Sequence, residues 1–352
     1  MVGSAELSTR KASNYAQVSA AVRAMKSKML GRNGYDRLLR CSSSSECMSV
    51  LREEGYFETA TTLGESLDST LWENLFDTKM ITLVHKLARL SPDDCAHLLA
   101  AFEDLYRLEF LKSGLRLMVA HEERETPSGI MPSGLTTDFL RSIVETRNVE
   151  RLVQAAGAPA LYSEISSAIA ENRPLPIVES IVDRYGFART WSATDMPDWA
   201  DKQSVQPLVG EHIDAVNLLL VARSKNLRIA SEEIQQVLLP VNYRLGDALS
   251  EAANSGSTTN ALRAFTKTIY AGSVERFLEA FKEDDSLHPL DVSLRRRHAT
   301  SCLSAFSGFP FCAGLPLAFA YLTGYELSDL RSIISGKSDG LATDRIEQSL
   351  IL

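Results

Sequence analysis

Apolar residues recur every three or four positions through much of the chain, which is the period of an amphipathic helix. The clearest runs are Val18, Ala21, Val22, Met25 and Met29; Ile81, Leu83, Val84, Leu87 and Leu90; and Leu98, Leu99, Phe102, Leu105 and Tyr106. The third run follows Ser91-Pro92-Asp93-Asp94, where a proline and two acidic residues suit the first turn of a helix. No proline precedes Pro92. The pattern therefore predicts an all-α fold.

Three stretches rich in Gly, Pro, Ser and Thr interrupt the helical pattern, and we expect each to be a loop between helices. They are Thr126 to Gly134, Pro197 to Pro207 and Asn254 to Thr259. Because none is long or low in complexity, flexible linkers are not indicated.

The stretch from Ala299 to Tyr325 contains no charged residue and is long enough to cross a bilayer. It also contains Pro310, Pro316 and three glycines among several serines, so its hydropathy is low for a spanning helix. We expect a buried turn followed by a core helix rather than a membrane span.

Two segments repeat one pattern at a constant spacing of 112 residues. Residues 217–240 (NLLLVARSKNLRIASEEIQQVLLP) align without a gap to residues 329–352 (DLRSIISGKSDGLATDRIEQSLIL), with six identities in twenty-four positions. The shared pattern is a helix, a short break, and a second short helix with an expected N-cap at Ser231 or Thr343.

Weaker copies of the first helix occur at Val18 to Leu30 and at Phe110 to Met118. A second module, in which a polar N-cap separates two short helices, recurs at Leu38 to Tyr56 and Leu249 to Tyr270, and more loosely at Phe139 to Ala156. Three or four copies of one helical unit predict similar lobes that bury their apolar stripes against neighbours. Chance similarity among amphipathic helices is the alternative.

Composition narrows the class of protein. The 352 residues are 45% hydrophobic and 23% charged, as in a globular protein with a large core. The net charge is −8 and the isoelectric point is near 5.4, which argues against binding of nucleic acid. The five cysteines form no CxxC pair, and the polar N-terminus lacks the apolar segment of a secretory signal. We therefore expect a reducing, cytosolic compartment.

The motifs of common catalytic sites are incomplete. Gly336-Lys337-Ser338 resembles the end of a phosphate-binding loop, but Arg331 stands where the motif needs its first glycine. We instead expect Gly336 to end a helix and Lys337 to face the negative end of the helix dipole. His121 lacks the second histidine of a metalloprotease helix, and no GxSxG elbow occurs. The sequence thus predicts no catalytic, cofactor-binding or metal-ligating residue, and the binding residues are unknown.

Charged clusters have simple interpretations. Arg295-Arg296-Arg297-His298 is a basic spot on an acidic chain, and we expect a solvated helix face, with contact to an acidic partner or a lipid headgroup as the alternative. Glu53-Glu54, Asp93-Asp94 and Asp284-Asp285 lie beside predicted helix ends, where negative charge favours the N-terminal end of the dipole or faces water.

Three segments carry a resemblance to a known family: Tyr15 to Leu30 (YAQVSAAVRAMKSKML), Ile213 to Lys225 (IDAVNLLLVARSK) and Gly314 to Leu352. The matching residues are Pro316, Ala320, Tyr321, Glu326, Leu330, Arg331 and Lys337 in the last segment, and Asp214, Asn217, Leu218, Arg223 and Lys225 in the middle one. On these residues the chain, from about Asn14 to Leu352, resembles the C subunit of the archaeal-type (A-type) ATP synthase. The same family includes the C subunit of bacterial V-type ATPases and the d subunit of the eukaryotic vacuolar enzyme.

The sequence departs from the family pattern at a few positions. Phe110 stands where the second copy usually has a polar residue, and Asp329 replaces the usual asparagine in the last copy. The region from Arg189 to Val209 has no clear match.

The resemblance implies three similar helical lobes around a pseudo-threefold axis that form a closed funnel. Lobe 1 would be residues 1–110, lobe 2 residues 111–215 and lobe 3 residues 216–352, with the C-terminal repeat closing onto lobe 1. It further implies a non-catalytic central-stalk subunit, present in a single copy on the cytoplasmic face of the membrane as a peripheral protein.

The partners implied by the resemblance are the central-axle subunits and the membrane rotor ring, without direct binding of nucleotide or nucleic acid. Such a protein would couple proton transport to ATP synthesis or hydrolysis. A helical-repeat scaffold or adaptor unrelated to rotary ATPases is the alternative, and an enzyme using the Gly336-Lys337-Ser338 turn is a second one. The Asp214/Asn217 and Glu326/Arg331 positions are open to two interpretations, as ties within a lobe or as contacts to partners.

Overall fold

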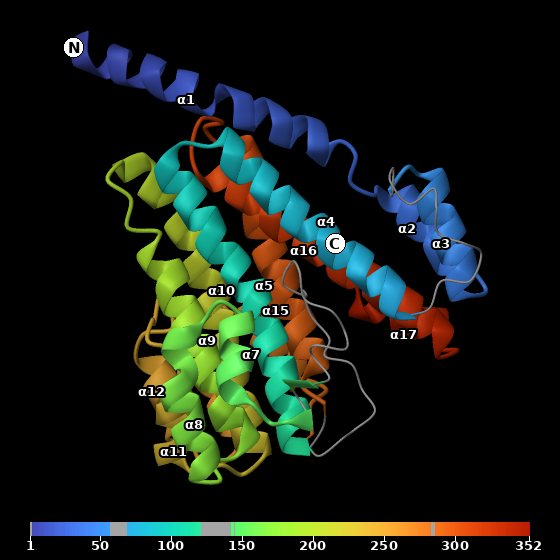
Figure 1. The fold of residues 1–352 in the computed structure, drawn as a ribbon, viewed down its shortest axis with the longest axis vertical. Helices are drawn as coiled ribbons and strands as arrows, with labels where there is room; N and C mark the ends of the chain where they lie inside the picture. Colours follow the sequence, from blue (N-terminus) through green and yellow to red (C-terminus); the bar gives the residue numbers. More distant parts are fainter. Residues whose placement is uncertain (1, 57–68, 121–141, 144, 283–285) are drawn as a thin grey trace. The chain divides into compact units, whose positions relative to one another are not determined.

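The computed structural model describes residues 2–56, 69–120, 142–143, 145–282 and 286–352 (Figure 1). Within these ranges the regular structure is helical and no strand is formed, which confirms the all-α fold. The helices are α1 (Val2–Lys26), α2 (Arg32–Arg40), α3 (Ser44–Glu53), α4 (Ser69–Leu90), α5 (Asp93–Ala120), α7 (Val149–Ala155), η1 (Pro159–Leu161), α8 (Tyr162–Ala170), α9 (Leu175–Ser192), α10 (Trp199–Asn226), α11 (Ser231–Val237), α12 (Asp247–Ala253), α13 (Thr258–Phe265), α14 (Ala271–Leu278), α15 (His288–Ser304), η2 (Ala305–Ser307), α16 (Gly314–Ser338) and α17 (Thr343–Ser349).

The chain divides into two compact units, and one of them takes residues from both ends of the sequence. Unit 1 consists of Met1–Ser91 and His288–Leu352, and unit 2 consists of Pro92–Leu287. The division into three lobes and the closed funnel remain predictions.

Helix α16 is the centre of unit 1. It packs against α1, α3, α4, α15 and α17, and Figure 1 shows α4 lying along it. Eighteen of its twenty-five residues are buried, including all but one of those between Gly314 and Glu326. The uncharged stretch ends in a core helix, as expected, but the predicted burial of the turn before that helix is wrong, because residues 307–309 are exposed. Of the helices in the described part of the chain, none combines the length and hydropathy required to span a bilayer.

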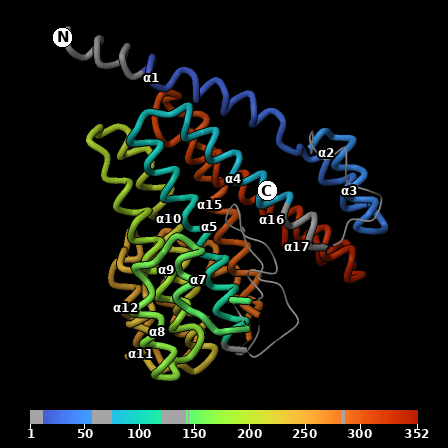
Figure 2. Tube along the Cα trace, viewed as in Figure 1, coloured from blue at the N-terminus to red at the C-terminus, as the bar shows by residue number. Residues whose placement is uncertain are grey.

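Unit 2 is built around α5, α9 and α10. Helix α9 packs against both α5 and α10, and Figure 2 shows α9 and α10 running alongside each other. The short helices α7 and α8 cover α5 and α9, whereas α11, α12 and α13 pack on α10.

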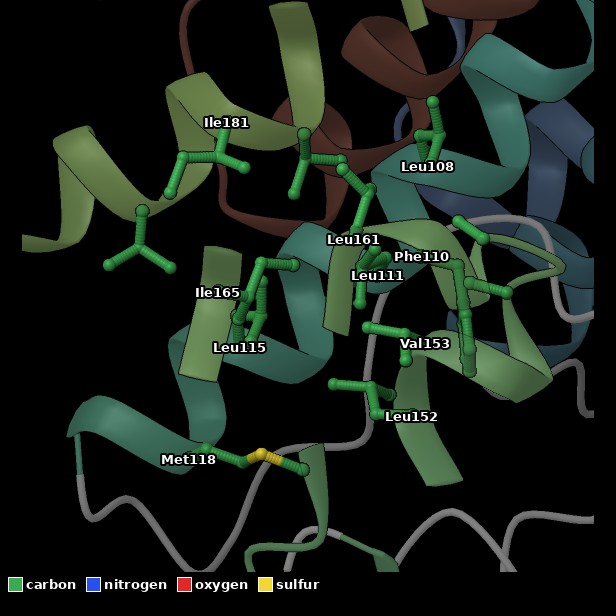
Figure 3. Close-up of a cluster of buried hydrophobic side chains, with 14 of the residues drawn as sticks. Leu108, Phe110, Leu111, Leu115, Met118, Leu152, Val153, Leu161, Ile165 and Ile181 are labelled. Atoms are coloured by element: carbon green, nitrogen blue, oxygen red, sulfur yellow. The ribbon is translucent and has the colours of Figure 1, made fainter. Parts of the chain in front are cut away.

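An apolar cluster holds α5 to the short helices of unit 2 (Figure 3). Leu111 and Leu115 of α5 lie among Leu152 of α7, Ile165 of α8 and the side chains of α9, and these four residues are fully buried. Each such leucine or isoleucine contributes about 1.5–3 kcal/mol through burial of apolar surface. Phe110, the departure from the family pattern, is fully buried in the same cluster, so its position here is apolar.

The predicted helix starts are largely confirmed. Helix α5 begins at Asp93, directly after Ser91-Pro92. In the copies of the second module at Leu38 to Tyr56 and Leu249 to Tyr270, a serine caps the second short helix. Ser43 accepts a hydrogen bond from the backbone N–H of Glu46, and Ser257 accepts one from Asn260, each at 3.2 Å.

The predicted loop at Pro197 to Pro207 is wrong, because α10 begins at Trp199 and continues through Pro207. A proline inside a helix removes one backbone hydrogen bond and costs about 3 kcal/mol. Burial of Val205, Leu208 and Val209 on either side of it offsets that cost. The loop at Asn254 to Thr259 is found between α12 and α13. The predicted loop at Thr126 to Gly134, with His121, Asp284 and Asp285, lies outside the described residues.

Candidate functional site

Two acidic residues of α16 form a polar node inside the core of unit 1. Glu326 and Asp329 are three residues apart and so share one face of the helix. Glu326 is 2% exposed and Asp329 is fully buried. Buried carboxylates require several hydrogen-bond donors, so their partners show what the node holds together.

Glu326 ties α16 to the N-terminal part of the chain. Its Oε1 accepts a hydrogen bond from the backbone N–H of Leu30 at 2.7 Å, and its Oε2 accepts one from the hydroxyl of Tyr56 at 2.8 Å. Leu30 lies just before α2 and Tyr56 just after α3, so one carboxylate holds both ends of this helical pair.

Asp329 ties α16 to the segment that follows α17. Its Oδ1 accepts from the backbone N–H of Ile351 at 2.6 Å, and its Oδ2 accepts from that of Leu352 at 2.9 Å. The hydroxyl of Tyr35 donates to the same Oδ2 at 3.3 Å.

An equivalent node lies on α10 in unit 2. Asp214 accepts hydrogen bonds from the backbone N–H groups of Tyr243 and Arg244 at 2.9 and 2.7 Å, and from the hydroxyl of Tyr270 at 3.1 Å. Asn217 accepts from the backbone N–H of Leu239 at 2.8 Å and donates to the carbonyl of Val241 at 2.9 Å. Asp214 and Asn217 are both fully buried.

The two nodes match residue by residue. Asp214 and Glu326 are 112 positions apart, as are Asn217 and Asp329, and Leu239 and Ile351. The donors of the second module match at a different spacing. Residues 30 and 244 are 214 positions apart, and so are residues 56 and 270. In unit 1, the donors to Glu326 therefore come from the segment before α4. In unit 2, the equivalent donors to Asp214 come from the segment that follows α10.

The repeat also places a lysine in the same role twice. Lys225 donates from Nζ to the hydroxyl of Ser231 at 3.0 Å, and Lys337 donates to the hydroxyl of Thr343 at 3.2 Å. The prediction that Ser231 and Thr343 are N-caps is wrong by one position, because Ala230 and Ala342 are the capping residues. The hydroxyls instead accept from the lysine of the preceding helix.

The end of α16 differs from the sequence prediction. The helix runs to Ser338, and the residue in the left-handed conformation that ends it is Gly340, with φ of 68°, rather than Gly336. Gly336 is needed for a different reason, because a Cβ there would lie 2.7 Å from Cγ1 of Ile346 in α17. Arg228 takes the left-handed conformation at the end of α10, 112 positions before Gly340.

The Gly336-Lys337-Ser338 segment is thus the last turn of a helix and not a phosphate-binding loop. Besides the hydroxyl of Thr343, the ammonium of Lys337 donates to the carbonyl of Leu39 at 2.6 Å.

Burial raises the pKa of the carboxyl groups in both nodes. Desolvation raises the pKa of Asp329 to about 6, although the N–H groups of Leu352 and Ile351 oppose the shift. Desolvation also raises the pKa values of Glu326 and Asp214 above their ordinary range. Burial together with the neighbouring carboxylates raises the pKa of Tyr35 and Tyr56, so both hydroxyls remain donors.

The remaining candidates from the sequence separate into exposed and buried groups. Arg295 and Arg296 are exposed, as expected, and Arg295 pairs with Asp291 of its own helix at 2.8 Å. His298 is only 2% exposed, and its Nδ1 lies 2.7 Å from the hydroxyl of Tyr325, so the prediction of a solvated face is wrong for it.

The cysteines and the metal-ligating residue types form no recognisable centre in the described part of the chain. All five cysteines are buried and form no disulfide, and burial raises the pKa of Cys47 to about 12. No three His, Cys, Asp or Glu side chains of the described residues lie close enough to share a metal ion.

Comparison with known proteins covers nearly the whole chain. The model of the ATP synthase (C/AC39) subunit family matches residues 18–349. The chain belongs to this family. Its curated relatives include the C subunit of the A-type ATP synthase of Methanocaldococcus jannaschii, which is 22% identical over 344 residues, or 96% of this chain and 86% of the relative.

Two further relatives of the family support the same assignment. The C subunit of the A-type ATP synthase of Methanococcoides burtonii is 24% identical over 97% of this chain and 95% of its own length. That of Pyrococcus abyssi is 18% identical over 95% of this chain and 89% of its own length. The family match contradicts the alternative of a scaffold unrelated to rotary ATPases.

The residues that carried the family resemblance prove to be structural ties. Glu326, Lys337 and Asp214 bind backbone or hydroxyl groups within their own unit, and Arg331 pairs with Asp77 of α4. Pro316, Ala320 and Leu330 are buried in α16. Asp214, Asn217 and Glu326 are thus buried in ties within their own unit, and Arg331 makes such a tie while its side chain stays partly exposed.

Sequence reasoning missed the donors Tyr35, Tyr56 and Tyr270. A usable signal existed, because residues 43–56 align without a gap to residues 257–270, with a serine at the start and a tyrosine at the end of both segments.

Proposed function

We propose that the chain is a non-catalytic central-stalk subunit of an A/V-type rotary ATP synthase or ATPase. In this role it connects the membrane rotor ring to the central axle, as a single copy on the cytoplasmic face of the membrane. It would thereby couple proton transport to ATP synthesis or hydrolysis while the nucleotide sites belong to other subunits.

The observation that carries this proposal is the family match over residues 18–349. The duplicated nodes support it physically. A part that transmits torque must resist shear between its helices, and each node fixes a long helix to other segments of its own unit. A hydrogen bond to a charged group contributes about 1.5–3 kcal/mol. These ties therefore hold the long helices in register.

Membranes from cells that lack this chain provide the test. We expect them to hydrolyse ATP in the soluble head without acidifying inverted vesicles, because the link between head and ring is lost. Adding back the wild-type chain should restore the number of protons pumped per ATP.

A graded test uses the tie in unit 1. The double variant Glu326→Ala with Tyr56→Phe should lower the pumping ratio more than Glu347→Ala, which removes an exposed carboxylate of the same unit. Vesicles that pump at the wild-type ratio without this chain would disprove the coupling role.

A further inference from the structure

Helix α1 and the turn between α15 and α16 form a continuous surface of unit 1. The hydroxyl of Ser19 donates to the carbonyl of Pro310 at 2.5 Å, and the guanidinium of Arg23 donates to that of Phe306 at 3.4 Å. The ammonium of Lys26 lies 4.6 Å from the centroid of the Phe306 ring. We call this surface, formed by Arg23, Lys26, Leu303, Phe306 and Phe309, the α1–η2 face.

The centre of the α1–η2 face is apolar and open to solvent. Phe309 is 52% exposed and Leu303 is 45% exposed. The ring of Phe309 packs edge-on against the half-buried ring of Phe311 with 5.6 Å between centroids. Scattered exposed apolar residues are ordinary, but here two of them lie six residues apart in one stretch that carries no charge.

The two chain segments that form this face carry charge of one sign. Residues 7–35 contain Arg and Lys but no acidic residue, and residues 292–325 contain Arg but no acidic residue. The whole chain has a net charge of −8, so this face is basic on an acidic protein. An apolar centre with a cationic rim is complementary to an acidic partner.

The exposed side of α1 next to this face carries mainly alanines, together with the polar side chain of Gln17 and the cation of Arg23. Ala16, Ala20 and Ala24 recur every four residues and are all exposed. Small side chains allow the backbone of a second helix to approach closely. A helix that inserts into lipid instead presents bulky apolar side chains such as Leu, Phe or Trp, which this side of α1 lacks between Ala12 and Lys26.

We propose that the α1–η2 face binds an acidic amphipathic helix of another protein. The partner helix lies along the alanine stripe, inserts an apolar side chain beside Phe309 and pairs its carboxylates with Arg23 and Lys26. This inference does not depend on the coupling role, because it rests on the charge and shape of this face alone.

The first experiment measures binding of a fluorescein-labelled helical peptide to the purified full chain by anisotropy. The probe has Leu on one side and Glu on the other over about 20 residues, and the control peptide has Lys in place of each Glu. We expect the acidic peptide to bind at least about tenfold more tightly than the control peptide. Equal affinity for the two peptides would overturn the proposal.

Variants locate the binding to the proposed face. Arg23→Glu combined with Lys26→Glu, and separately Phe309→Ser, should each weaken binding of the acidic peptide by about tenfold or more. Arg263→Glu and Tyr162→Ser are the matched controls, since each changes an exposed residue of unit 2, and they should leave the affinity unchanged. Loss of binding in the controls, or none in the face variants, would contradict the assignment.

Ala20→Leu distinguishes a helix from a membrane surface. Because Ala20 is exposed, the variant should fold with the wild-type Tm, which circular dichroism checks. A bulkier stripe should weaken binding of the acidic helix. If instead the chain sediments with phosphatidylglycerol vesicles and Ala20→Leu strengthens that association, while no peptide binds, the occupant is lipid and the proposal is wrong.

Discussion

Asn217 and Asp329 hold the same position in two copies of one unit, and the backbone that each faces explains why they differ. Residue 352 is a leucine whose N–H donates to the carboxylate of Asp329, whereas the matching residue 240 is a proline without an N–H. In the middle copy, Nδ2 of Asn217 lies next to the carbonyl of Val241 instead. An amide nitrogen can donate a hydrogen bond to this carbonyl, whereas a carboxylate oxygen cannot. An aspartate therefore suits position 329, because both of its carboxylate oxygens accept from backbone N–H groups.

Asn217→Asp should destabilise unit 2 at neutral pH. One carboxylate oxygen would then face the carbonyl of Val241, now 2.9 Å from the amide nitrogen, and two acceptors would be left unpaired in the core. We expect a loss of about 1–3 kcal/mol in the free energy of unfolding, measured by urea denaturation. Protonation supplies a donor, so the loss should shrink as the pH falls and the new carboxyl group takes up a proton. An equal loss at all pH values would argue against this explanation.

Asp329 should make the stability of unit 1 depend on pH. Its pKa is raised to about 6 in the folded chain from 3.8, so the folded state binds the proton more tightly than the unfolded state. Its contribution to stability is therefore greatest below pH 3.8 and is lost as the pH rises through about 6. We expect the difference in unfolding free energy between the wild type and Asp329→Asn to fall by about 1–3 kcal/mol across that window. A flat difference over the same range would contradict the assignment.

At the scale of elements, a hydrogen bond and an apolar contact hold α17 against the end of α16. Lys337 donates to Thr343 at the start of α17, and Ile346 packs against the bare backbone of Gly336. Ile346 is only 2% exposed, so the close approach buries most of its side chain.

Gly336→Ala should loosen α17 by overpacking. The new Cβ would lie 2.7 Å from Cγ1 of Ile346, closer than packed carbon atoms allow. We expect a cost of about 1–3 kcal/mol by thermal or urea unfolding. The double variant with Ile346→Ala should cost less than the sum of the two single variants, because the clash is removed. Additive costs would indicate that the two residues do not meet.

Sequence alone identified the helices and the repeat but not the atoms that close each unit. Periodicity located α1, α4 and α5 because their buried faces recur at helical spacing. It failed at Pro207, where local propensity predicts a break and tertiary burial overrides it. It also misassigned Ser231 and Thr343, since a hydroxyl at a helix start can accept from a lysine that only the folded structure brings near. The tyrosines of the nodes were missed because their partners lie far away in the sequence.

At the scale of the molecule, unit 1 is held together by contacts between distant parts of the chain. The bond from Leu30 to Glu326 spans 296 residues, and that from Tyr56 spans 270. Unit 2 is continuous, and its equivalent bonds to Asp214 span 29 to 56 residues. Equivalent hydrogen bonds therefore join nearby residues of the sequence in unit 2 and distant residues in unit 1.

Weakening the Glu326 tie should loosen unit 1 and leave unit 2 protected. We expect Glu326→Ala to increase amide hydrogen exchange in α2 and α3 together with α16, because all three share the node. Exchange in α9 and α10 should match the wild type. Asp214→Ala is the reciprocal variant and should give the opposite pattern. Uniform exchange across both units in either variant would show that they unfold as one.

The long span of the Glu326 tie has a consequence during synthesis. At a translation rate of about 5–20 residues per second, roughly 15–60 s separate the emergence of Leu30 from that of Glu326. During this interval unit 2 can form its own hydrogen bonds on the ribosome. The apolar faces of α2 and α3 stay exposed until the C-terminal helices of unit 1 have been synthesised. The nascent chain is thus a natural client for a chaperone that shields its first ninety or so residues until α16 arrives.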